Sequence, residues 1–109
     1  MPITVPTADD AEAVYAFIIE RANEEFEATI GDETLSSDAM DRFSRISNAH
    51  KLGITGLTAY IVDLVNRGDI EQAALAWDHL TAAGEEWRDH PDYLPAWENV
   101  QRAEIRSSL

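Results

Sequence analysis

The chain has 109 residues, enough for about one globular domain, so residues 1–109 are expected to form a single domain. It contains no cysteine, which excludes a disulfide framework, a thiolate metal site and a thiol nucleophile. Twenty-one acidic residues outnumber eight basic ones, and the formal charge of −13 disfavours direct binding to nucleic acids or anionic membranes. No apolar stretch reaches the roughly 20 residues that cross a bilayer, and no signal peptide is evident, so we expect a cytoplasmic protein.

The charges are distributed unevenly along the chain. Residues 1–41 hold eleven acids and one base, a net charge of −10, and residues 69–109 hold nine acids and three bases, a net charge of −6. Between them, residues 42–68 hold four bases and one acid, a net charge of +3. The negative excess favours a basic partner.

The first helix is predicted over residues 8–30. Thr7 is a good N-cap, and Asp9 and Asp10 follow where the helix dipole favours negative charge. Gly31 provides the end of the helix. Apolar residues recur at steps of three and four, as a helix with one buried face requires: Ala11, Val14, Tyr15, Ile18, Ala22, Phe26 and Ile30.

A second, long helix is predicted over residues 38–67, beginning after Ser37. One apolar face, from Met40 to Val65, continues through the whole segment without losing phase. Gly53 and Gly56 lie away from the centre of that face, where they indicate a kink or a close helix crossing. Two shorter helices broken near the sequence LGITG are the alternative.

Two further helices complete the predicted fold. Gly68 and Asp69 form a stop and a restart, which places the third helix at residues 69–89. Pro91 ends it, and a fourth helix is predicted over residues 93–107. The sequence thus predicts an all-α fold, a small antiparallel bundle of about four helices.

Aromatic residues gather around the predicted corner between the last two helices, in the sequence DHPDYLPAW and just before it. They are Trp77, Trp87, Tyr93 and Trp97. Aromatic side chains at corners usually bury area and hydrogen-bond their polar tip, so we expect them to clamp the last helix to the others. The alternative is a partner-binding aromatic surface, which could also join two copies of the chain.

Two resemblances are visible in the sequence. The run LTAYIVDLVNRGDIEQAALAWDHL resembles a single tetratricopeptide helical hairpin, which implies that the second and third helices pair. The segments AVYAFIIERANEEFEA, DAMDRFSRISNAHK and WRDHPDYLPAW resemble a group of short actinobacterial proteins of unknown function. This second resemblance implies a lineage of actinobacteria or their phages and carries no assigned activity.

The sequence contains no pattern typical of catalysis or metal binding. His50 on the apolar face of the second helix could form a buried hydrogen-bonded pair with Glu25, which is a structural role in the absence of a nucleophile. His79, Glu86, His90 and Asp92 have a generic spacing that does not identify a metal site. We therefore predict no enzyme activity, no cofactor and no metal.

Three glutamates occupy the face of the first predicted helix opposite its apolar stripe: Glu20, Glu24 and Glu27. Like charges four residues apart destabilise a helix by a few tenths of a kcal/mol, so folding alone does not require them. Their axial steps of about 6 and 4.5 Å are on the scale of the roughly 3.4 Å rise per phosphate of one DNA strand. Asp32 and Glu33 extend the face. A solvated face that only confers solubility is the alternative.

The favoured interpretation is a non-enzymatic acidic binding protein, encoded by a phage or mobile element, that inhibits or regulates a basic partner. Its carboxylates would imitate DNA phosphates in the groove of a nucleic-acid-binding protein. The second interpretation is a structural or adaptor module, as a monomer or a homodimer, that binds through the aromatic surface around Trp77–Trp97.

Overall fold

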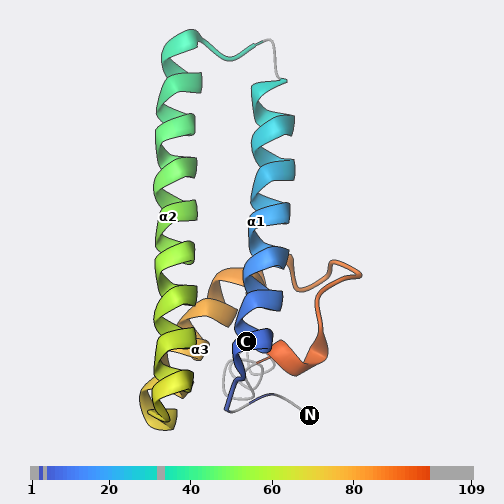
Figure 1. The fold of residues 1–109 in the computed structure, drawn as a ribbon. Coiled ribbons are helices and arrows are strands. Elements are labelled where there is room, and N and C mark those ends of the chain that lie inside the picture. The colour runs from blue at the N-terminus through green and yellow to red at the C-terminus, as the bar shows by residue number, and fades with distance from the viewer. Residues whose placement is uncertain (1–2, 4, 32–33, 99–109) are drawn as a thin grey trace, which may run out of the picture.

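The computed structural model describes residue 3, residues 5–31 and residues 34–98. Within these residues the chain is all-helical and forms three α-helices, α1 (Ala8–Ile30), α2 (Ser37–Arg67) and α3 (Ile70–Gly84). Two short 3-10 helices follow, η1 (Glu85–Trp87) and η2 (Pro95–Trp97). The helices α1 and α2 lie side by side as an antiparallel hairpin, and α3 crosses its lower half (Figure 1). The all-α prediction is confirmed, and the number of helices in the described part is smaller than predicted.

Local capping determines where the helices begin and end. Thr7 and Asp10 form a reciprocal capping box, with Thr7 Oγ1 accepting from the Asp10 N–H and Asp10 Oδ2 from the Thr7 N–H. Ser36 caps α2 by accepting from the Ala39 N–H. Asp69 caps α3, directly after Gly68 ends α2 in the left-handed conformation at φ 78°. The predicted bounds of the first two helices are confirmed to within one residue.

The helix α2 continues from Ser37 to Arg67 without a break, so the alternative of two shorter helices is wrong. A Cβ added at Gly53 or Gly56 would meet no atom within 4 Å in the described part of the chain. The two glycines therefore do not serve a close helix crossing within the molecule. Alanine at either position would be accommodated and would favour the helix more strongly.

The predicted third helix is too long, and the predicted fourth helix does not begin at residue 93, because residues 93 and 94 are not helical. The helix α3 ends at Gly84, where the backbone tightens into η1, and the chain then turns at Pro91. Of the predicted fourth helix, residues 95–97 form η2, and residues 99–107 lie outside the described residues. Proline explains the difference, because the residue before it is driven to extended backbone, as Leu94 is at φ −88° and ψ 135°.

The hydrophobic core occupies the end of the hairpin that α3 covers. It consists of Ala11, Val14, Phe17 and Ile18 of α1, Ile54, Ile61 and Leu64 of α2, Ala73, Ala76, Trp77 and Leu80 of α3, and Trp97. Each fully buried large aliphatic side chain contributes about 1.5–3 kcal/mol by leaving water. Within the described residues, no helix combines the length and the low polarity that a membrane span needs.

The other end of the hairpin is not covered by α3 and is called the arm below; it comprises residues 22–30 of α1 and 37–53 of α2. Every residue of the arm is at least partly exposed. Its main contact is a stack of Phe26 on Phe43, with ring centroids 5.5 Å apart and planes 10° from parallel. The ammonium of Lys51 lies 5.5 Å from the centroid of the Phe26 ring. The stack of Phe26 on Phe43 thus joins the two helices in the part of the hairpin that α3 does not cover.

The N-terminal segment is attached to the core by Ile3. The Trp77 indole N–H donates to the Ile3 carbonyl at 3.0 Å, and the Ile3 N–H donates to the Ala96 carbonyl at 2.7 Å. These bonds satisfy the polar edge of a buried indole and join residues at both ends of the described chain.

Alanine in place of Gly68 is expected to lower the free energy of unfolding by about 1 kcal/mol, because a Cβ is strained at positive φ. The same substitution at Gly53 is expected to raise it by about 0.5–1 kcal/mol, because that site is helical and open. Urea denaturation of both variants beside the parent chain measures the two effects. Changes of the same sign would contradict this assignment.

Phenylalanine in place of Trp77 is expected to release Ile3 while keeping most of the core. The Ile3 carbonyl loses its donor, and the shorter ring leaves a space, so unfolding should become easier by about 2 kcal/mol. Amide hydrogen exchange at Ile3 should accelerate more than exchange in α2. Unchanged protection of the Ile3 amide would show that the indole hydrogen bond does not hold the segment.

Candidate functional site

Among the described residues, Arg21 is the charged side chain that the fold buries. It lies on α1 at the boundary between core and arm, and only 3% of its surface is exposed. It follows Ile18 by three positions and Val14 by seven, so the helix turns it toward the same buried side. Its guanidinium carbon lies 5.3 Å from the centroid of the Phe17 ring, within range of a cation–π interaction.

Three carboxylates surround this guanidinium. Arg21 Nη2 lies 3.0 Å from Glu20 Oε1 and 3.0 Å from Glu24 Oε1, and Nη1 lies 3.5 Å from Asp92 Oδ2. The three acidic side chains remain 67%, 58% and 71% exposed. One buried cation therefore holds three carboxylates at the surface, and these four side chains together carry a formal charge of −2.

His90 connects the corner after α3 to Arg21. The Asp92 N–H donates to His90 Nδ1 at 3.0 Å, and Arg21 Nη1 lies 3.1 Å from Nδ1 and 2.8 Å from Nε2. The Arg21 guanidinium, which can only donate, therefore lies within hydrogen-bond distance of both ring nitrogens. The ring is held in place by two donors and by an edge contact with Phe17 at 5.7 Å.

The predicted acidic face is present on α1, with one difference from the prediction. Glu20, Glu24 and Glu27 are all exposed, but the first two are ion-paired with Arg21. Asp32 and Glu33 lie outside the described residues. Sequence reasoning missed Arg21, although it is the one base in residues 1–41 and is in phase with Val14 and Ile18.

The aromatic corner is mainly part of the core. Trp77 and Trp97 are 2% and 5% exposed, so both are buried in the core, while most of the last predicted helix, which they were expected to clamp, lies outside the described residues. An aromatic surface built from all four predicted residues is therefore wrong, because only Trp87 and Tyr93 are partly exposed. The Trp87 indole N–H donates to Glu25 Oε1 at 2.8 Å, which ties the corner to α1.

The predicted buried pair of Glu25 and His50 is not formed. Both residues are exposed, and Glu25 accepts from Trp87 instead. The two side chains line an open pocket of about 250 Å³ between the arm and the corner, together with Ala22, Phe43, Ile46, Ser47 and Trp87. The pairing failed because Ile54 and Ile61, rather than His50, define the centre of the buried face of α2.

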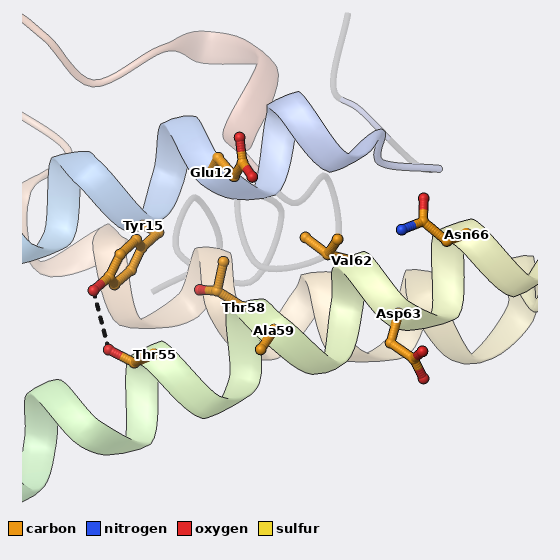
Figure 2. A pocket seen from close by; sticks show the side chains of 8 residues that line it. All are labelled: Glu12, Tyr15, Thr55, Thr58, Ala59, Val62, Asp63 and Asn66. Carbon is orange, nitrogen blue, oxygen red and sulfur yellow. Dashed lines mark hydrogen bonds between the residues drawn. The ribbon is translucent and has the colours of Figure 1, made fainter.

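A larger groove of about 480 Å³ lies between α1 and α2. Its lining consists of Glu12 and Tyr15 of α1 and Thr55, Thr58, Ala59, Val62, Asp63 and Asn66 of α2. Figure 2 shows Tyr15 reaching across to Thr55, and the two hydroxyl oxygens are 3.1 Å apart. Tyr15 thus bridges the helices, while Glu12 and Asp63 add carboxylates to a largely apolar wall. Such a groove suits the aliphatic stem and cationic head of a lysine or arginine side chain.

Within the described part of the chain, no three side chains of histidine, aspartate or glutamate are grouped so that they could hold a metal ion. Comparisons of the chain with known protein families, with curated proteins and with solved structures found no match. The function therefore has to be inferred from the geometry of the charged corner, Arg21 with Glu20, Glu24, His90 and Asp92.

Alanine in place of Arg21 is expected to lower the free energy of unfolding by about 2–3 kcal/mol, because it removes a buried stem and leaves three carboxylates without a cation. Arg67 provides the control, since its pair with Asp63 is 61% exposed on both sides. Alanine at that position should cost at most about 0.5 kcal/mol. Equal losses in thermal or urea unfolding would show that burial gives Arg21 no special role.

Proposed function

We propose that the protein is a non-enzymatic binding protein that engages a basic protein partner through an acidic patch formed by Glu20, Glu24, Glu27 and Asp92. The partner class is a nucleic-acid-binding protein, whose groove the carboxylates occupy in place of phosphates. The protein then acts as an inhibitor or regulator, as expected for a product of a phage or mobile element.

The observation that carries the proposal is the way in which Arg21 holds the carboxylates. Flexible glutamates on a helix lose side-chain entropy when they bind, typically about 0.5–1.5 kcal/mol each. Glu20 and Glu24 already have one oxygen held at 3.0 Å from a buried guanidinium. The remaining lone pairs face solvent, where they can accept from a lysine or arginine of the partner. The patch is therefore preorganised and still carries unbalanced negative charge.

The charge of the whole chain supports the same partner class. A formal charge of −13 attracts basic proteins and accelerates their approach at low ionic strength. Glu27 lies one turn beyond Glu24 along the exposed side of α1, and Asp92 brings a fourth carboxylate from a different part of the chain. An aromatic adaptor surface has less support, because Trp77 and Trp97 are buried.

Replacing Glu20, Glu24 and Glu27 together with glutamine is expected to weaken binding of a synthetic arginine-rich peptide about tenfold at low salt. Glutamine keeps an acceptor oxygen near Arg21, so the fold should persist. Titration calorimetry at increasing sodium chloride concentrations should also show a flatter salt dependence for this variant.

A matched control separates the patch from net charge. Asp9, Asp41 and Glu71 are exposed and lie outside the patch, and their replacement by asparagine or glutamine removes the same charge. This control should lose less than about threefold in affinity, since it keeps the preorganised carboxylates. Equal losses in the two triple variants would mean that only overall charge matters and would reject the patch.

A further inference from the structure

A second surface lies on α2, on the side opposite the buried residues of that helix, and one of its members, Asp63, also lines the groove between α1 and α2. This surface faces away from the buried residues Ile54 and Ile61. At 100° per residue its members fall within a sector of about 80°. This outer stripe consists of Asp38, Arg42, Arg45, Ala49, Leu52, Gly56, Tyr60, Asp63 and Arg67, all of which are exposed.

The middle of the outer stripe consists of two large side chains, Leu52 and Tyr60, and two small residues, Ala49 and Gly56. Leu52 is 73% exposed and Tyr60 is 47% exposed. Gly56 lies between them, and a Cβ at Gly56 or at neighbouring Gly53 would meet no atom within 4 Å in the described residues. A helix face with this composition allows a second backbone to approach closely, at the lower end of the usual interaxial distance of about 8–10 Å.

The charges of the outer stripe are complementary to those of the same stripe on a second, antiparallel copy of α2. If a two-fold axis passes between Leu52 and Gly53, Arg42 of one helix lies opposite Asp63 of the other, and Asp38 lies opposite Arg67. In the same register Arg45 lies opposite Tyr60, and Ala49 opposite Gly56. A parallel arrangement would instead place Arg42 against Arg42 and Asp63 against Asp63. The charge pattern therefore selects the antiparallel orientation.

We propose that the outer stripe of α2 binds the outer stripe of a second copy of this chain, as an antiparallel pair with two-fold symmetry. Each ion pair then occurs twice. The existing contact between Asp63 and Arg67, at 3.0 Å within one helix, becomes part of a ladder of alternating charges with Arg42 and Asp38 of the other copy. The acidic patch lies on other elements, α1 and the corner at Asp92, so the pairing does not depend on the proposed function.

Light scattering and sedimentation equilibrium of the full chain test the pairing. The parent chain should form a dimer that dissociates on dilution, and Leu52→Glu should weaken it at least about thirtyfold, because like charges meet at the two-fold axis. Leu75, 55% exposed on α3 and outside the stripe, provides the control. Leu75→Glu should change the dissociation constant less than about threefold. A parent chain that remains monomeric at millimolar concentration, or a dimer that survives Leu52→Glu, overturns the proposal.

Variants with a reversed charge test which residues of the two copies of α2 lie opposite one another. Arg42→Glu and Asp63→Arg should each weaken self-association about tenfold, because each variant places like charges opposite one another at two positions. An equimolar mixture of the two variants should form a heterodimer close to parental affinity, since both pairs are then of opposite sign. Failure of the mixture to associate overturns the antiparallel register.

Cross-linking tests the orientation directly, because the chain has no cysteine of its own. Leu52→Cys should cross-link to itself with a short bismaleimide, since its two copies are offset by only about 1.5 Å along the axis. Arg42→Cys should not, because its copies lie about 31 Å apart, whereas a mixture of Arg42→Cys and Asp63→Cys should cross-link. Self-cross-linking of Arg42→Cys would indicate a parallel pair and overturn the proposal.

Discussion

The unequal length of the helices is the constraint on which the rest of the structure depends. The helix α3 has 15 residues and α2 has 31, so α3 covers only one half of the hairpin. Core residues accordingly cease after Ile18 on α1 and begin at Ile54 on α2. Beyond that level α1 and α2 join through the stack of Phe26 on Phe43, and Trp87 after α3 reaches the near end of the arm at Glu25. The molecule thus combines a three-helix core with a two-helix arm, rather than the uniform bundle that the sequence predicts.

Arg21 occupies the boundary that this mismatch creates. A guanidinium can be buried there because Phe17 contacts it on the core side while exposed carboxylates reach it from the solvent side. The desolvation cost of the charge is offset by several partners, none of which has to be buried itself. The same cation anchors the corner that contains His90 and Asp92, so the charged residues of α1 and those after α3 form one cluster. The ion pairs and hydrogen bonds of Arg21 thus add to the packing of Tyr93 and Trp97 on Phe17 in fixing the corner.

Features that depend on local sequence could be predicted. Thr7, Gly68 and Asp69 determine helix ends through contacts within three or four residues, and their effects follow from the sequence alone. Features that depend on which faces of the helices pack against each other could not be predicted from the sequence. Nothing local distinguishes Trp77, whose indole reaches Ile3, from an exposed tryptophan. Likewise, the net charge of residues 1–41 includes Arg21 only as one base beside eleven acids. Its burial follows from its position three residues after Ile18, which turns it toward the buried side of α1. The predicted start of the fourth helix at residue 93 was wrong because Pro95 drives Leu94 before it to extended backbone.

The uninterrupted backbone of α2 has a mechanical consequence. The helix passes from the core into the arm without a break, and its 31 residues extend for about 46 Å. Hydrogen bonds along an α-helix resist bending except at prolines, bulges and similar defects, so α2 extends from the core into the arm as one stiff element. A force applied near the loop between α1 and α2 is therefore transmitted to the packing of α3. Any molecule that grips the tip of the arm acts mechanically on the core about 25 Å away.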